Sequence, residues 1–337
     1  MIFYKCPKCA RTWRQLVGIC PYCFAALERI KTYQATVVGS SRVSISTILH
    51  PKAPYHLLLL EDNLSNRLIC KSEKEIILGE EFKRDRSQGE VVAWRIKYDL
   101  TEAIEEVFIP SVGPESKILI LPTVVSPTHS YLRENTSPEF LMATIDYLLS
   151  RGAKKDNIIV GAQSFGEGSI MPSAVKSGLL ELCLGKGLKV VDLAEGPFIK
   201  KGNLEVSETV LQADLVINLA MMKMGQASAS ENIFKVLEKG NYSARIYLES
   251  GKEVVDEIIK NVPNIFTLGE ADAVRRSDGS IVFLGIILSG SNPLKVDKVF
   301  NRIVQAKKQP ELLKDVNLAD VSLSGRSIME LEYEADK

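Results

Sequence analysis

Four of the six cysteines form two closely spaced pairs near the N-terminus, Cys6 with Cys9 and Cys20 with Cys23. Both pairs have the form C-P-x-C, and ten residues separate them. Two such knuckles supply four thiolates to one point, which is the closed tetrahedral shell of a structural zinc. Buried or redox-active cysteines are the alternative, which the pairing in β-rich surroundings disfavours. The sequence therefore predicts one structural zinc site with no open position for catalysis.

Polar residues that follow predicted buried strands are the other candidates for chemistry. The segment GAQSFGEGS (161–169) offers backbone amides that can hold a carboxylate or phosphate, although a ligand-free glycine turn explains it equally well. Lys223 is the one charge in LAMMKM (219–224), where it can bind an anion or exchange a proton. The predicted ligand-binding residues are Lys223, Asp297, Ser164, Gly166 and Glu270.

Several common catalytic sites are excluded or disfavoured, and no catalytic residue can be assigned. The chain has three histidines, too few for a histidine-rich metal centre. Ser164 has no GxSxG context, and the loop around it is neither a Walker A motif nor a GxGxxG motif. The methionines of LAMMKM are more typical of core packing than of copper ligation.

The elements that position these residues change character along the chain. Up to about residue 86 the sequence has short β-rich runs with turn signals such as Gly39, and it contains no convincing helix. After residue 89, near-continuous apolar runs alternate with helical patterns, which indicates a mostly parallel sheet covered by helices. We expect a multidomain chain with a zinc ribbon at 1–30, a small β-barrel of the OB-fold at 31–86 and an α/β domain at 89–337.

Within the α/β segment the predicted strands are 117–125, 157–163, 188–193, 214–220, 264–268 and 280–288. Ser137 can cap a helix that begins at Pro138 and ends near Gly152, and Asp99 can cap another. A third helical pattern runs from about Pro172 to Leu184.

Composition and charge limit the class of protein. The 337 residues are 45% hydrophobic and 25% charged, as in folded globular proteins, which excludes overall disorder. No apolar run approaches the ~18 residues that span a bilayer, and the sequence start lacks the apolar stretch of a signal peptide, so we expect a cytoplasmic protein with no membrane partner. The chain is neutral overall, but residues 1–60 carry eight Lys or Arg against one acid. This local charge of +7 favours an anionic partner.

The first segment resembles the zinc-ribbon and OB-fold proteins of domain-of-unknown-function family 35. Trp13, the second knuckle CPYC, APYHLLLLED (53–62) and IILGEEF (76–82) carry the resemblance, which covers residues 1 to about 86. The resemblance implies a scaffold or CoA-binding partner of thiolase-like and hydroxymethylglutaryl-CoA synthase-like enzymes.

The second segment resembles domain-of-unknown-function family 362 over about residues 89 to 304. The matching stretches include KILILPTVV (117–125), TSPEF (136–140), ADLVINLAMMKM (213–224), ENIFKVL (231–237) and GIILSGSNPLKVDKVF (285–300). The chain lacks the cysteines of the ferredoxin-like segment that often accompanies this family, so no iron-sulfur role is implied.

Departures from the family 362 pattern affect ionisable positions. A K-P-N at the first strand end is Leu121, Pro122 and Thr123 here, and T-H-P-E is 136–139, reading T-S-P-E. Lys223 and Asp297 are retained. The pattern favours a retained fold in which ancestral chemistry is reduced.

Three hypotheses for function follow. The leading one is an accessory or scaffold protein that binds acyl-CoA or a thiolase-like acyl-transfer enzyme. The second is an enzyme acting on a small anionic substrate in the α/β cleft, using Lys223 with Asp297 or Glu270. The third is a single-stranded nucleic-acid-binding module, which the neutral charge of the whole chain disfavours.

Overall fold

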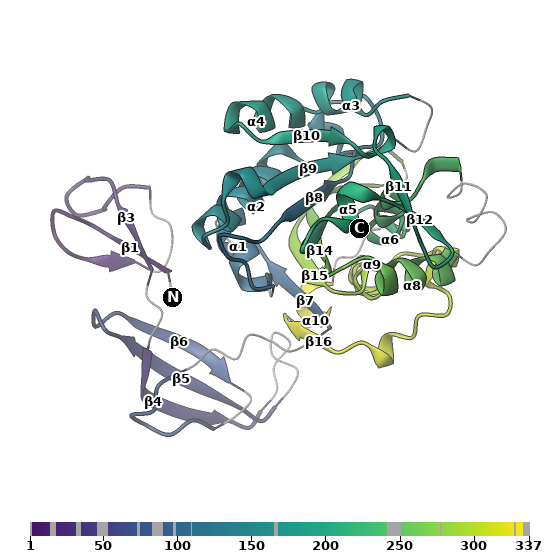
Figure 1. The fold of residues 1–337 in the computed structure, drawn as a ribbon. Helices are drawn as coiled ribbons and strands as arrows, with labels where there is room; N and C mark the ends of the chain where they lie inside the picture. The colour runs from purple at the N-terminus through teal and green to yellow at the C-terminus, as the bar shows by residue number, and fades with distance from the viewer. Residues whose placement is uncertain are drawn as a thin grey trace. The chain divides into compact units, whose positions relative to one another are not determined.

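The structure is a computed structural model that describes residues 2–332, apart from 14–17, 32–34, 46–52, 73–74, 83–89, 97–98, 109, 165–167, 241–250, 277 and 327. The chain divides into two compact units, Met1–Arg86 and Ser87–Lys337 (Figure 1). No helix in the described part of the chain combines the length and the apolar character needed to cross a membrane.

The first unit contains two small antiparallel sheets. In one, β1 (Ile2–Lys5) lies between β2 (Thr12–Trp13) and β3 (Glu28–Lys31). In the other, β5 (Tyr55–Asp62) lies between β4 (Ala35–Val43) and β6 (Arg67–Ser72). These sheets agree with the predicted β-rich segment. The closed OB-fold barrel expected for residues 31–86 stays a prediction.

The turn expected at Gly39 is wrong, because this glycine lies inside β4. The pairing register with β5 shifts between Val37 and Gly39, which marks a bulge. A Cβ atom at Gly39 would lie 3.2 Å from the Cβ atom of Leu59 on β5. Here glycine permits a close approach of two strands and does not reverse the chain.

The second unit is built on an eight-stranded sheet in the order β10-β9-β8-β13-β14-β15-β7-β16. Its strands are β7 (Val91–Arg95), β8 (Ile118–Pro122), β9 (Ile158–Ala162), β10 (Lys189–Asp192), β13 (Leu215–Met221), β14 (Ile265–Arg275), β15 (Ile281–Gly290) and β16 (Leu323–Gly325). The strands from β10 to β14 in this order are parallel, whereas β15 runs antiparallel to both β14 and β7. The mostly parallel sheet predicted from the sequence is therefore confirmed. A separate hairpin joins β11 (Phe198–Lys201) and β12 (Leu204–Ser207).

Helices cover both faces of this sheet. They are α1 (Leu100–Val107), α2 (Pro138–Ser150), α3 (Met171–Lys176), α4 (Leu179–Lys186), α5 (Glu208–Leu211), α6 (Ser228–Ile233), α8 (Gly251–Asn261), α9 (Pro293–Ile303) and α10 (Ile328–Leu331). The 3-10 turns are η1 (Ser130–Leu132), η2 (Lys155–Asn157), η3 (Leu193–Glu195), η4 (Phe234–Val236), η5 (Glu311–Leu313) and η6 (Leu318–Asp320). Buried residues of α1, α2 and α4 pack on one face, and those of α6, α8 and α9 pack on the other (Figure 1).

Two helices begin at the caps predicted from the sequence, but one predicted helix is interrupted in the structure. Ser137 caps α2 by accepting a hydrogen bond from the Phe140 amide, and Asp99 caps α1 in the same way from Thr101. The helix expected from Pro172 to Leu184 is instead two helices, α3 and α4. Gly178 interrupts them with a φ of +82°, a left-handed conformation that glycine adopts at little cost.

Candidate functional site

The four N-terminal cysteines converge at two turns with the same backbone geometry. The amide of Cys6 donates to the Arg11 carbonyl and that of Cys20 donates to the Ala25 carbonyl, both at 2.9 Å. In addition, the amides of Ala10 and Phe24 donate back to the Cys6 and Cys20 carbonyls, and both residues have a φ of 57°. Each knuckle therefore presents its two thiols from the same tight turn.

The spacing of the sulfur atoms fits one tetrahedral metal ion. The Sγ atoms of Cys6 and Cys23 are 3.2 Å apart, those of Cys9 and Cys20 are 3.6 Å apart, and all four lie within 4.8 Å of one another. Zinc–sulfur bonds of about 2.3 Å place tetrahedral sulfur ligands about 3.8 Å apart. The four cysteines can therefore bind a metal such as zinc, which would complete the ribbon and leave no open coordination position.

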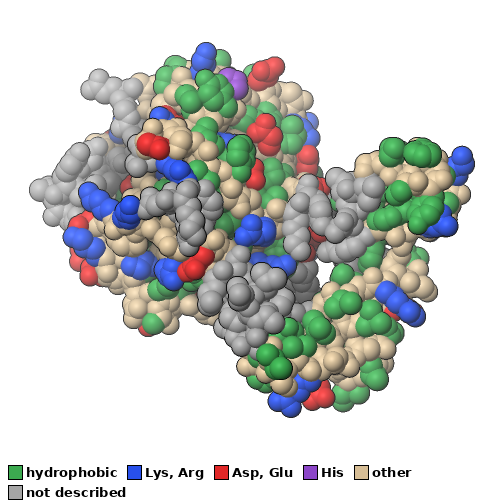
Figure 2. All heavy atoms as spheres, turned by 180° about the vertical axis from the view of Figure 1, so that it is seen from behind, with side chains coloured by type: hydrophobic (Ala, Val, Ile, Leu, Met, Phe, Trp, Pro, Cys, Tyr) green, Lys and Arg blue, Asp and Glu red, His purple; other side chains and the backbone are tan. Residues whose placement is uncertain are grey.

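Exposed apolar side chains gather on the first unit (Figure 2). Leu59 of β5 pairs with Gly39 on one side and with Ile69 on the other. Ile69 is 67% exposed, and Val38 and Leu57 are exposed beside this row. We call Val38, Leu57, Leu59 and Ile69 the apolar sheet face. Contiguous exposed apolar surface of this kind is typical of interaction sites.

The ribbon adds an aromatic cluster. Tyr22, between the second pair of cysteines, is 65% exposed, and its ring lies 6.5 Å from that of Trp13. The Arg11 guanidinium covers the Tyr22 ring at 3.8 Å from its centroid. Tyrosine, tryptophan and arginine are the residue types that dominate binding energy at protein interfaces.

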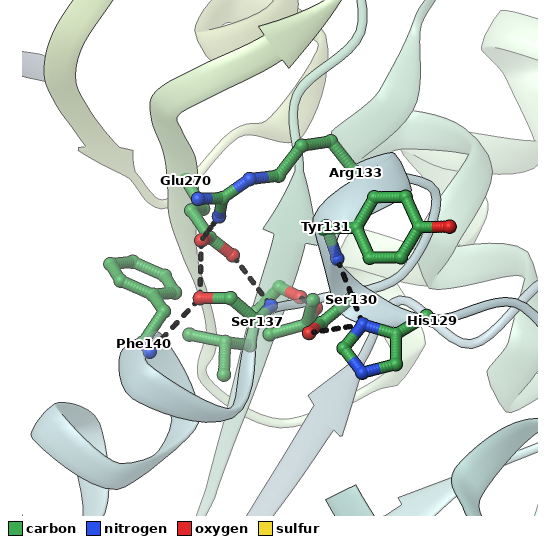
Figure 3. A network of polar contacts seen from close by, with 9 residues as sticks. His129, Ser130, Tyr131, Arg133, Ser137, Phe140 and Glu270 are labelled. Carbon is green, nitrogen blue, oxygen red and sulfur yellow. Dashed lines mark hydrogen bonds and ion pairs between the residues drawn. The ribbon is translucent and has the colours of Figure 1, made fainter. Parts of the chain in front are cut away.

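In the second unit, Glu270 organises the carboxyl edge of the sheet, where the parallel strands end. It lies within β14, is 1% exposed, and accepts hydrogen bonds from the backbone amide and the hydroxyl of Ser137 at 2.9 and 2.5 Å. Arg133 donates to the same carboxylate at 3.2 Å (Figure 3). Burial raises the pKa of Glu270 to about 7, although the bonds from Ser137 and the charge of Arg133 oppose the shift. Glu270 thereby connects β14 to the start of α2.

Asp297 has a similar positioning role at α6. Its side chain is fully buried in α9 and accepts hydrogen bonds from the amides of Ala229 and Ser230 and from the Ser230 hydroxyl, at 2.7 to 2.9 Å. Burial raises the pKa of Asp297 to about 7 against these bonds. These hydrogen bonds occupy both oxygens of the carboxylate, so Asp297 holds the first turn of α6.

Lys223 lies two residues beyond β13 and is half-buried. Loss of hydration lowers its pKa, Glu134 and Glu231 oppose this effect, and Arg275 adds to it. Glu134 is itself paired with Arg275 and accepts from the Ser126 hydroxyl. Lys223 therefore lies within electrostatic range of charges on the loop after β8, on α6 and on β14.

The predicted ligand-binding residues that the structure describes lie in different parts of the second unit. Lys223 and Glu270 both lie at the carboxyl edge of the sheet, each beside its own charged partners. Ser164 is half-buried two residues after β9, and Gly166 lies outside the described residues. Asp297 lies inside α9 and not at a strand end.

Sequence reasoning missed five charged residues of this edge, which are Arg133, Glu134, Glu231, Lys235 and Arg275. Glu231 and Lys235 lie in the stretch ENIFKVL, where the four-residue spacing was a usable signal. Arg133, Glu134 and Arg275 carry no local signal that separates them from ordinary surface charges.

Two solved structures and one family model are similar to parts of this chain. A solved structure described as Ltp2-ChsH2(DUF35) aldolase is 18% identical, with a TM-score of 0.21, covering 24% of this chain and 68% of that one. Another, a DUF35 protein of unknown function from Sulfolobus solfataricus, is 24% identical with a TM-score of 0.18, covering 23% of this chain and 62% of that one. No curated protein matches. Residues 118–241 match the family model described as Domain of unknown function (DUF362), which confirms that resemblance for this part of the second unit.

Proposed function

We propose that this protein is an accessory protein whose zinc-bound first unit docks a CoA-dependent, thiolase-like acyl-transfer enzyme or holds its acyl-CoA. The observation that carries the proposal is the apolar sheet face, which is exposed in a unit that also has a strongly basic N-terminal stretch. Apolar side chains supply the burial that stabilises a complex, and positive charge selects an acidic partner or the phosphates of CoA.

The docking surface is supported by the geometry of its centre. Leu59 and Ile69 are cross-strand neighbours, and Gly39 adds no side chain beside them, so the three positions form a shallow apolar surface. The ion pair between Arg67 and Glu61 lies at its edge, with 2.7 Å between Nε and Oε2. An apolar centre with a charged rim is the usual anatomy of a protein interface.

The test uses Ile69→Glu in the full chain with zinc bound. A buried carboxylate at the centre of an interface should weaken binding of the purified thiolase-like enzyme from the same organism by roughly 100-fold or more. The matched control is Leu184→Glu, since Leu184 of α4 is 64% exposed in the second unit. Titration calorimetry gives both affinities. If the two variants bind the enzyme with equal affinity, the apolar sheet face is not part of the interface.

Two further titrations distinguish acyl-CoA binding from binding of single-stranded nucleic acid. Acyl-CoA should bind saturably and lose affinity in Arg42→Ala, because Arg42 is an exposed cation of β4. Submicromolar binding of single-stranded DNA or RNA at physiological salt, with no response to CoA, would replace this function with nucleic-acid binding.

Lys223 is the one predicted ligand-binding residue that favours a second function. We propose that the carboxyl edge of the sheet binds a small anionic substrate or ligand at this lysine. Ligands of parallel α/β sheets bind beyond the carboxyl ends of the strands, where Lys223 lies. Loss of sulfate and acetate binding in Lys223→Met, with an unchanged fold, is the expected result.

A further inference from the structure

The C-terminal half of α9 and the segment that follows it form a groove that neither proposed function uses. Its volume is about 620 Å³, within the range of small-molecule sites, roughly 300 to 1,000 Å³. Three cations line it, Lys298, Arg302 and Lys314, against one acid, Asp315. The groove lies outside the residues that match the family 362 model. Its position and its charge therefore indicate a site for an anion that is separate from the carboxyl edge of the sheet.

Lys298 is the cation that the fold holds in place. Its Nζ atom donates to the Leu313 carbonyl at 3.1 Å and to the side-chain oxygen of Gln309 at 3.4 Å, and the residue is half-buried. Both acceptors are neutral, and no carboxylate in the described part of the chain forms an ion pair with this ammonium group. Because an ammonium group has three N–H donors, one remains for a further acceptor. Lys298 is therefore a pre-positioned anchor for an anion.

The other two cations are paired with acids that do not line the groove. Arg302 lies one turn after Lys298 on α9, and its Nη1 atom is 2.7 Å from the Oε1 atom of Glu332. Lys314 pairs with Glu311, and both side chains are largely exposed. Exposed ion pairs contribute little to stability, so both cations can exchange a carboxylate for a more highly charged anion at small cost.

Two side-chain amides add hydrogen-bond donors to the lining. The Oδ1 atom of Asn317 accepts from the Ala319 amide at the start of η6, and the side-chain oxygen of Gln309 accepts from Lys298. These contacts use the oxygen of each amide and leave its NH2 group as a donor. A phosphate monoester carries close to two negative charges near neutral pH and has three strong acceptor oxygens, so it can engage several of these donors at once. A carboxylate, with one charge and two oxygens, can engage fewer.

We propose that this groove binds the phosphate group of a small organic phosphate, with Lys298 as its anchor and with Arg302 and Lys314 as further charged partners. Glu332 competes with the phosphate for Arg302, and Asp315 opposes binding from within the lining. The site involves neither the first unit nor Lys223, so it is independent of the two functions proposed above.

Titration calorimetry on the full chain at about pH 8 and low salt measures the affinities for inorganic phosphate, AMP and CoA. Lys298→Met should weaken binding roughly tenfold or more, because it removes a charge-assisted hydrogen bond. Glu332→Gln should tighten binding roughly two- to fivefold, since it releases Arg302 from an exposed ion pair. A merely structural role of Glu332 would not raise the affinity.

Lys186→Met is the matched control, because Lys186 of α4 pairs with Asp146 outside the groove and should leave the affinities unchanged. Circular dichroism checks that each variant is folded. If Lys298→Met does not fold, Lys314→Met replaces it, since this side chain is 59% exposed and its loss should weaken binding several-fold.

The outcomes distinguish this site from those proposed above. If wild type binds none of the three probes, the phosphate site is overturned. If Lys298→Met and Lys314→Met bind as wild type does, the phosphate binds elsewhere and the site is also overturned; Arg42→Ala and Lys223→Met then test the other two locations. Weaker binding of CoA in Lys298→Met but not in Arg42→Ala supports the groove and identifies CoA as the source of the phosphate. The same result with AMP alone supports the groove with a simpler organic phosphate.

Discussion

The replacement Glu270→Gln gives a direct test of the buried carboxylate in the second unit. Glutamine keeps the shape of the side chain and an acceptor for the Ser137 amide, but it cannot ionise. The wild-type carboxyl is 1% exposed, and its pKa is raised from 4.5 to about 7. Only the wild-type protein should therefore show the stability change that accompanies ionisation of this group.

The sign of the effect follows from the direction of the shift. Because the folded pKa lies above the unfolded value, the unfolded chain releases this proton first as the pH rises. The favourable contribution of Glu270 is complete below about pH 4.5 and is lost as the pH rises through about 7. At about 1.4 kcal/mol for each pKa unit, the shift from 4.5 to about 7 corresponds to a loss of about 3 kcal/mol, most of which falls between about pH 5 and pH 8.

Urea denaturation of the full chain, followed by far-ultraviolet circular dichroism, provides the measurement. The free energy of unfolding is compared between wild type and Glu270→Gln at about pH 5 and about pH 8, so that groups common to both proteins cancel. The Glu270→Gln variant should gain about 2 to 3 kcal/mol of stability relative to wild type over this range. A difference that stays constant with pH, or one that moves in favour of wild type, would refute the raised pKa.

Three other substitutions test the remaining structure. Cys6→Ser should release the metal measured by elemental analysis and unfold the ribbon, while the circular dichroism of the second unit persists; loss of the whole signal would contradict two separable units. Asp297→Ala should destabilise the chain by about 2 to 4 kcal/mol in urea, because two buried amides of α6 lose their acceptor; an unchanged midpoint would contradict this role. Gly325→Ala should cost about 2 kcal/mol or more, because φ is +85° and the new Cβ atom would lie 2.3 Å from the Ala93 carbonyl oxygen. Gly279→Ala is its control, with a φ of +87° but no atom closer than 3.6 Å, and equal losses would show that backbone conformation alone matters.

The strands of the second unit were predictable where burial is continuous. All five residues of β8 and all seven of β13 are buried, and both sequences are unbroken apolar runs. The strand β7 was missed because its five residues directly follow a charged stretch, although the helix capped by Asp99 was predicted just after it. The antiparallel direction of β15 was also missed, since an apolar run has the same appearance in either direction.

The site was less predictable than the sheet because its contacts join distant parts of the chain. The cap at Ser137 follows from local sequence, but its bond to Glu270 spans 133 residues. Lys235 and Val124 are 111 residues apart. Local patterns identify which side chains can ionise, whereas the order of the strands decides which of them meet. Apolar runs of similar length and composition do not determine that order.

The acids expected to do chemistry at the carboxyl edge instead hold backbone amides in place. Glu270 and Asp297 accept from backbone amides at the starts of α2 and α6. Asp192, at the end of β10, likewise accepts from the amides of Ile170 and Ala194. A carboxylate that fixes a helix start is a poor general base, because releasing its donors would leave buried amides unsatisfied. Among the basic groups, Lys235 donates to the Val124 carbonyl, whereas Lys223 is half-buried. The hydrogen bonds already made by Asp297 and Glu270 therefore disfavour acid–base catalysis by these two carboxylates.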